Sequence, residues 1–103
     1  MNSHGNVVHA HHPMLAGHFP GNPIVPGAWL LAWIIAVAGQ QLAAAKVARA
    51  IAGVKRVKFQ RPLAPEQMFE CALKMGADTL RFTVTSGEVV IADGALLLQN
   101  IDE

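Results

Sequence analysis

The sequence predicts an α+β fold in which an antiparallel sheet of about five strands wraps around one long central helix. A long apolar stretch of helix-forming residues occupies positions 28–46, and its first three turns show no polar face. A helix that is apolar all round has to be surrounded by protein on most sides. Strand-like segments joined by short turns follow it, and short turns force neighbouring strands to be antiparallel. A sheet that curves around the helix satisfies these observations together.

The segments that precede the helix are a strand and a loop. A first strand is predicted over residues 6–12, which contain the β-branched Val7 and Val8. Residues 13–27 hold four prolines and three glycines, and we therefore expect a loop there. The helix over residues 28–46 ends beside Lys46 and Arg49, whose charges suit the carbonyl end of a helix.

Four strands joined by short turns are predicted after the helix, and apolar and polar side chains alternate most clearly in the second and third of them. The segments are residues 50–59, 66–75, 80–85 and 88–99. In the second segment Phe69, Cys71, Leu73 and Met75 share one face. Gly53 and Gly94 interrupt the first and last segments, and each is a candidate β-bulge.

The composition indicates one domain over residues 1–103. This domain has more apolar residues than a soluble monomer of ordinary composition. Hydrophobic residues make up 52% of the chain and charged residues only 15%, against about 25% charged in ordinary globular domains. A subunit interface is therefore expected, as a homodimer, a higher homo-oligomer or a heteromer. The net charge of +1 gives no general case for nucleic acid, and Cys71 alone cannot form an internal disulfide.

A cytoplasmic, non-membrane protein is expected. The N-terminal residues have neither the basic start nor the apolar core of a signal peptide. The apolar stretch over residues 28–39 is shorter than the roughly 20 residues that cross a bilayer. We therefore favour a buried helix of a soluble protein over a transmembrane segment.

The run HFPGNPIVPGAWLL, residues 18–31, is the most informative part of the chain for function. It begins with His18, whose imidazole titrates near neutral pH, and it leads through Pro26 and Gly27 into the helix. The free N–H groups of a helix N-terminus suit developing negative charge. The run therefore supplies half of an acid–base site.

Three motifs resemble the hotdog-fold 3-hydroxyacyl-acyl-carrier-protein dehydratases. They are GHFPGNPIVPG at residues 17–27, GVKRVKFQRPLAPEQ at residues 53–67 and GEVVIADGALLL at residues 87–98, in the order of that family. The resemblance implies a hotdog fold, a 3-hydroxyacyl thioester substrate on acyl carrier protein or coenzyme A, and no cofactor or metal.

The resemblance also implies a role for each matched residue. His18 matches the catalytic histidine, which removes the C2 proton of the substrate. Gly27, with Ala28 beside it, matches the helix start whose backbone N–H binds the thioester carbonyl, and Ile24 matches the residue whose carbonyl orients the imidazole. An enolate-like oxygen gains most from such preorganised donors.

The sequence departs from the family at the second catalytic position. The family carries an Asp or Glu fourteen residues after the histidine, on the helix of the other subunit, and here that position is Ala32. The glutamine usual four residues later is Ala36, and no acidic residue precedes Glu66. Loss of a general acid typically costs about 10²–10⁴ in rate.

Other histidines and aromatics have simpler interpretations that we favour. His11 and His12 could replace the missing acid, but solvent-facing strand-end histidines are more common. His9 and His11 could share a metal, yet no acidic residue or cysteine is near them in sequence. Trp29 and Trp33 lie on one helix face and are expected in the core or a dimer contact rather than as a gate for the acyl chain.

A local run of basic residues is a candidate docking surface for the acidic acyl carrier protein. The alternative interpretation is a strand face that is simply exposed to solvent. The members of the run are Lys55, Arg56, Lys58 and Arg61. The expected function is dehydration of a 3-hydroxyacyl thioester in fatty-acid or related biosynthesis. A non-catalytic carrier partner or heteromer subunit, and an acyl thioesterase, are the alternatives.

Overall fold

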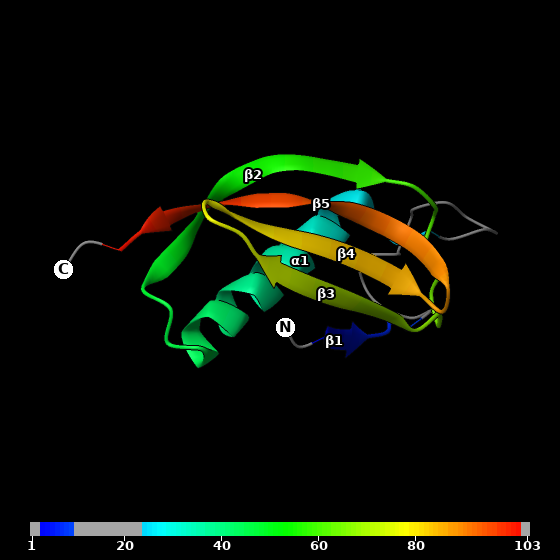
Figure 1. The fold of residues 1–103 in the computed structure, drawn as a ribbon. Helices are drawn as coiled ribbons and strands as arrows, with labels where there is room; N and C mark the ends of the chain where they lie inside the picture. The colour runs from blue at the N-terminus through cyan, green and yellow to red at the C-terminus, as the bar shows by residue number, and fades with distance from the viewer. Residues whose placement is uncertain (1–2, 10–23, 102–103) are drawn as a thin grey trace.

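The α+β prediction is confirmed by the computed structural model, which describes residues 3–9 and 24–101 (Figure 1). The elements in chain order are β1 (Ser3–Asn6), α1 (Gly27–Ala44), β2 (Arg49–Phe59), β3 (Phe69–Met75), β4 (Thr79–Ser86) and β5 (Val89–Asn100). The five strands form one sheet in the order β1-β3-β4-β5-β2. Every neighbouring pair is antiparallel. The strands β1 and β2 therefore form the two edges of the sheet.

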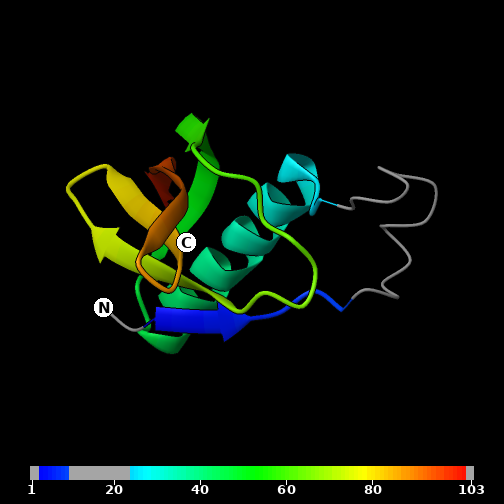
Figure 2. The same cartoon turned by 90° about the vertical axis from the view of Figure 1, so that its right-hand side faces the viewer.

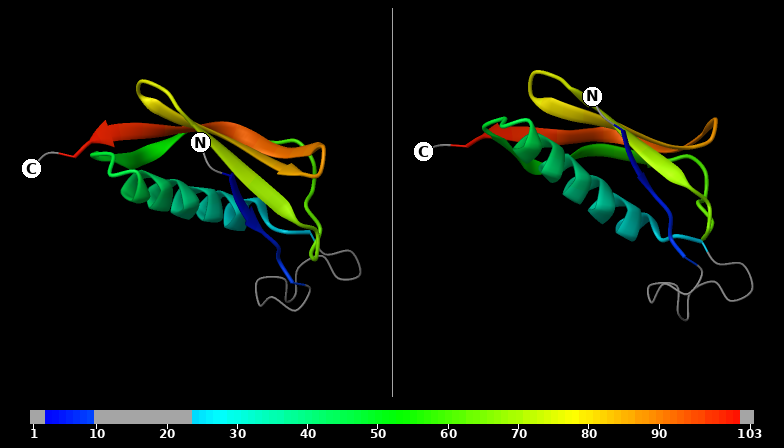
Figure 3. Two further views of the ribbon diagram at one scale, coloured as in Figure 1. Left: turned by 60° about the horizontal axis from the view of Figure 1, so that its bottom comes forward. Right: turned by 90° about the horizontal axis from the view of Figure 1, so that it is seen from below.

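The helix α1 covers one face of the curved sheet, and no other described element covers the opposite face (Figures 2 and 3). Its buried side chains recur every three or four residues, which places them on a single helix face. They are Leu30, Ile34, Val37, Ala38 and Leu42. By length and composition α1 could also cross a membrane. Here these five residues instead belong to the hydrophobic core that α1 shares with the sheet.

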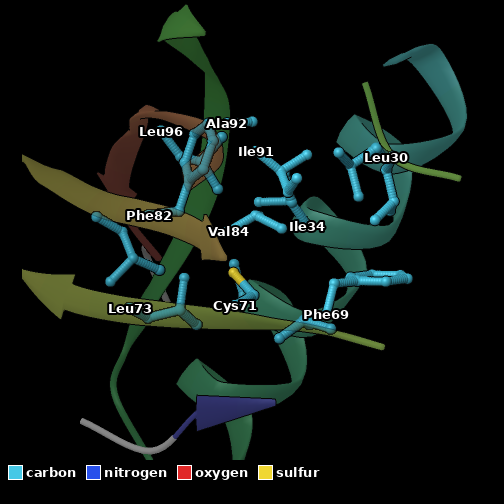
Figure 4. Close-up of a cluster of buried hydrophobic side chains, with 14 of the residues drawn as sticks. Leu30, Ile34, Phe69, Cys71, Leu73, Phe82, Val84, Ile91, Ala92 and Leu96 are labelled. Atoms are coloured by element: carbon cyan, nitrogen blue, oxygen red, sulfur yellow. The ribbon is translucent and has the colours of Figure 1, made fainter. Parts of the chain in front are cut away.

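The core lies between α1 and the inward-facing residues of the three central strands (Figure 4). Phe69, Cys71 and Leu73 of β3 are buried, and Glu70 and Ala72 between them are exposed, as the alternation predicts. On β4, Leu80, Phe82 and Val84 are buried and Arg81 and Thr83 between them are exposed, also as predicted. The buried side chains of β3, β4 and β5 lie on the side of the sheet that faces Leu30 and Ile34 of the helix.

The first strand differs from the prediction because Asn6 ends it. The strand runs over Ser3–Asn6, and residues 7–9 of the predicted strand 6–12 are not extended in the sheet. The Asn6 side-chain oxygen accepts the N–H of Val7 at 2.8 Å, a local bond that competes with a sheet ladder. Val8 is buried beyond the strand, and its carbonyl accepts the N–H of Glu66 at 2.6 Å.

The helix starts one residue earlier than predicted and ends two residues earlier, at Ala44. It ends there because Lys46 adopts φ 56°, in the left-handed region. The N–H of Lys46 bonds to the carbonyl of Ala43 at 3.1 Å, and that of Val47 bonds to Leu42 at 3.0 Å. These two bonds form a Schellman motif in which lysine occupies the position that glycine usually takes.

The third predicted strand begins at Phe69 rather than at residue 66. Glu66 has φ 65°, which no strand residue adopts. The Gln67 side chain accepts the N–H of Ala64 at 3.2 Å and closes a turn in front of the strand.

One of the two glycine bulges is confirmed and the other is wrong. The register of β2 against β5 shifts between Ile51 and Gly53, as expected. It does not shift at Gly94, and the irregularity of β5 falls where Ile91 has no partner on β4. A Cβ at Gly94 would clash with the backbone carbonyl oxygen of Arg56 and lie 2.7 Å from Phe82 Cζ. Close packing therefore requires this glycine.

Gly94→Ala is expected to lower the free energy of unfolding by at least about 2 kcal/mol, because the added methyl group meets backbone that cannot move aside. The control is Gly39→Ala on the exposed face of α1, where a Cβ meets nothing within 4 Å. That substitution should stabilise the protein by about 0.5–1 kcal/mol. Urea denaturation measures both, and equal effects would contradict the packing described here.

The buried thiol of Cys71 predicts a loss of stability in alkali. Cys71 is 0% exposed, and burial raises the pKa of its thiol to about 12. In the unfolded chain the thiol ionises at its ordinary pKa, so its contribution to stability is complete below that pH and declines as the pH rises toward 12. Unfolding measured between pH 8 and 11 should show a smaller decline for Cys71→Ala than for the wild type. Identical slopes would contradict the assignment.

Candidate active site

The N-terminus of α1 carries backbone N–H groups that suit an incoming negative charge. Pro26 is the N-cap residue, and its carbonyl accepts the first helical bond from Leu30 at 3.1 Å. The first turn contains no acidic residue, and the N-cap residue itself makes no side-chain capping bond. The leading N–H groups of a helix have no acceptor within the helix and carry the positive end of its dipole. Gly27 presents the first of them.

A short backbone contact fixes where the helix begins. The N–H of Val25 donates to the carbonyl of Leu63 at 2.8 Å, and both side chains are buried. Pro26 then sets the backbone angle that starts the helix. The N-terminus of α1 is thus held against the loop that follows β2.

A cavity of about 350 Å³ opens at this junction. Its walls are mostly apolar, with one guanidinium group and one amide among them. The lining residues are Ile24, Val25, Gly27, Leu30, Phe59, Gln60, Arg61, Pro62 and Leu63. The Phe59 ring lies so close to the helix start that a Cβ at Gly27 would be 3.0 Å from Phe59 Cζ. A glycine at this position lets the aromatic wall approach the helix N–H groups.

The structure brings part of the predicted site together. Ile24 and Gly27 line the cavity, and Ala28 is exposed beside them. His18, like His11 and His12, lies outside the described residues. The described part of the predicted site therefore consists of the N-terminus of α1 and an apolar wall.

The basic run does not form one continuous patch. Arg61 lines the cavity at the helix start, whereas Arg56 lines a different cavity. Lys55 and Lys58 are exposed on β2. The end of β2 explains the division: Arg56 lies within the strand, whereas Arg61 follows Phe59, the last residue of β2, in the loop beside the helix start.

Position 32 faces away from the chain's own core. Ala28, Ala32 and Ala36 are all exposed and, at a spacing of four residues, share one face of α1. Trp29 and Trp33 are partly buried and pack against the core cluster. The predicted core role thus holds for both tryptophans within this chain.

The Trp33 ring meets Phe69 edge to face at a centroid distance of 5.0 Å. Aromatic rings in this arrangement attract each other beyond the area they bury. The contact ties the middle of α1 to β3.

Sequence reasoning missed one pairing near the site. His9 Nδ1 lies 3.4 Å from a carboxylate oxygen of Glu66, and the backbone of Glu66 bonds to Val8. Glu66 has a left-handed φ. His9 and Glu66 are 57 residues apart in the sequence, so no local sequence pattern indicates their contact. Among the described residues no three histidine, cysteine or acidic side chains gather as metal ligands.

A five-stranded antiparallel sheet wrapped around a helix, with an apolar cavity at the helix N-terminus, defines the hotdog class. A family model described as ApeI-like, ApeI dehydratase, matches residues 4–95. The chain belongs to this family of dehydratases, and the family predicted from its motifs is confirmed.

Curated relatives agree with this assignment. The chain is 34% identical to the 3-hydroxyacyl-acyl-carrier-protein dehydratase FabZ of Symbiobacterium thermophilum over 79% of its own length and 60% of that protein's. It is 32% identical to the FabZ of Acetivibrio thermocellus over 87% of its length and 68% of that protein's. The chain thus spans about two thirds of the length of these relatives.

Solved structures share the fold. A protein from Erwinia carotovora subsp. atroseptica has a TM-score of 0.76 at 25% identity, covering 98% of this chain and 84% of that one. The dehydratase heterocomplex ApeI:P from Xenorhabdus doucetiae has a TM-score of 0.74 at 22% identity, with 93% and 84% covered. The fluoroacetyl-CoA-specific thioesterase FlK has a TM-score of 0.68 at 12% identity, with 97% and 90% covered. The thioesterase therefore shares the fold alone.

Proposed function

We propose that this protein binds a 3-hydroxyacyl thioester, carried by acyl carrier protein, and dehydrates it as a cytoplasmic enzyme of fatty-acid or related acyl-chain biosynthesis. The observation that carries the proposal is the cavity at the start of α1, where helix N–H groups meet an apolar wall. This combination suits a thioester carbonyl with an acyl chain attached to it. Family membership supports the reaction class.

The proposed steps use the two ends of the motif at residues 18–27. The N–H of Gly27 donates to the thioester carbonyl oxygen, and the His18 imidazole, oriented by the Ile24 carbonyl, takes the C2 proton. The electron pair of the broken C–H bond moves toward the carbonyl and gives an enolate-like oxygen at the helix N-terminus. The electron pair then moves back from the oxygen and forms the C2–C3 double bond. The C3 hydroxyl takes up one proton and leaves as water.

The group that protonates the leaving hydroxyl has to come from elsewhere. In the proposed assembly a second hotdog subunit packs against the exposed alanine face of α1 and pairs with β2, an edge strand of the sheet. An identical partner would bring water or a histidine, and a different hotdog chain could bring a carboxylate. Arg61 at the cavity, with the exposed Lys55 and Lys58 on β2, would attract an acidic carrier.

A second candidate function is that of a non-catalytic subunit, with residues 1–103 as one hotdog domain that holds the acyl thioester for an acid-bearing partner. The exposed Ala32 favours it, because the position that carries the acid in the family faces outward and holds none. The similar fold of a subunit in the ApeI:P heterocomplex supports this proposal. Thioester hydrolysis would need a carboxylate at the same place and is less favoured.

An assay of a 3-hydroxyacyl-pantetheine substrate tests the proposed reaction. The wild type should form the enoyl product slowly, and His18→Ala should reduce the rate by about 10²–10⁴, the usual cost of a lost acid or base. Ala32→Glu should increase the rate, because a carboxylate returns to the helix. The matched control is Ala43→Glu, the same change at another exposed position of α1, which should have no effect.

The outcomes separate the candidate functions. A wild-type rate equal to that of His18→Ala would contradict the enzyme proposal. Saturable thioester binding without turnover, together with turnover once a second hotdog chain from the host is added, would support the non-catalytic subunit. Release of free thiol would identify a thioesterase instead.

A further inference from the structure

Three basic residues form a row across the outer face of the sheet. The helix α1 covers the opposite face (Figure 3). The strand register places Lys74 of β3 directly opposite Arg81 of β4. Arg81 lies opposite Ala95 of β5, which in turn lies opposite Arg56 of β2. Residues that are register partners point to the same face, so the three cations and Ala95 make one line across four strands.

The row borders a cavity of about 610 Å³. Arg56, Lys74 and Arg81 line it, together with Thr83 and Asp93 of the neighbouring row. Ala95 is only 1% exposed although it lies on the outer face. Its register partners on both sides are arginines, and both of these residues are exposed.

The row carries three positive charges and no negative charge. Lys74 and Arg81 stand on adjacent strands, about 5 Å apart at their backbones, and like charges directly opposite each other destabilise a sheet. The one carboxylate of the cavity, Asp93, accepts a hydrogen bond from the Gln60 amide and has Lys58 as its register partner. The cavity thus holds three cations against a carboxylate that its own neighbours already engage.

We propose that this cavity on the outer face is a binding site for a phosphate-bearing ligand, with a diphosphate as the best match. Lys74 and Arg81, as direct partners, suit one phosphate group. Arg56 lies two strands from Arg81, about 10 Å at the backbone, and reaches a second group across Ala95. Guanidinium forks bind phosphate oxygens in pairs, and an ammonium group adds a point charge.

The geometry favours a small phosphate ligand over an acidic protein surface. The cations converge on one concave cavity, whereas a docking protein needs charges spread over a larger area. The site is also separate from the cavity at the start of α1, which lies on the other side of the sheet and is lined by different residues. The proposal is therefore independent of the dehydratase chemistry.

Calorimetric titration with inorganic pyrophosphate tests the site. The wild type should bind it saturably and more tightly than inorganic phosphate, and ADP should bind through the same groups. Arg81→Gln should weaken binding at least tenfold. Lys46→Gln, which removes an equal charge from the exposed end of α1, should change it less than twofold. Equal losses in the two variants, no saturation at 10 mM, or tighter binding of a poly-glutamate peptide would each overturn the proposal.

A thermal measurement on Lys74→Gln gives an independent check that the protein is folded. Without anion this variant should melt at the wild-type temperature or above, because it removes the repulsion from Arg81. Pyrophosphate should raise the melting temperature of the wild type and leave that of the variant unchanged. A variant that melts lower and still responds fully to pyrophosphate would contradict a binding role for Lys74.

Discussion

The packing of one face of α1 onto the sheet is the contact on which the rest of the structure depends. The helix is apolar on both faces, but the described residues of its own chain cover only the side that carries Leu30, Ile34 and Leu42. The opposite side presents alanines at positions 28, 32 and 36 to solvent. An exposed apolar face of this extent is typical of a surface that binds another protein. One face of α1 therefore packs into the core of its own subunit, and the opposite face is left exposed.

The same packing sets up the candidate site. Because the sheet fixes the helix along its length, the start of α1 is held against Leu63 and the Phe59 ring, and the cavity forms between them. A helix N-terminus without an acidic residue then faces an apolar wall. The proposed carbonyl binding at this point would need backbone N–H groups alone, so it does not depend on a carboxylate elsewhere on the helix.

The sequence patterns predicted those features that depend on local periodicity. The helix and the alternation in β3 and β4 follow from where apolar residues recur, and Gly53 correctly indicated a bulge. Features that depend on contacts between distant residues were missed. Gly94 serves close packing against Arg56 and Phe82 rather than a bulge, and His9 meets Glu66 from the far side of the chain. The basic run is continuous in sequence, yet β2 ends at Phe59, so Arg56 in the strand and Arg61 in the loop after it line different cavities.

Hydrogen exchange at C2 of the substrate tests most directly whether the start of α1 and His18 supply the base and carbonyl-binding half of a dehydratase. The protein is incubated in D₂O with a 3-hydroxyacyl-pantetheine thioester, and deuterium at C2 is followed alongside enoyl formation. If that half is intact and the acid is missing, C2 exchange should be faster than dehydration and should disappear in His18→Ala. No exchange in the wild type, or exchange that His18→Ala leaves unchanged, would contradict this assignment.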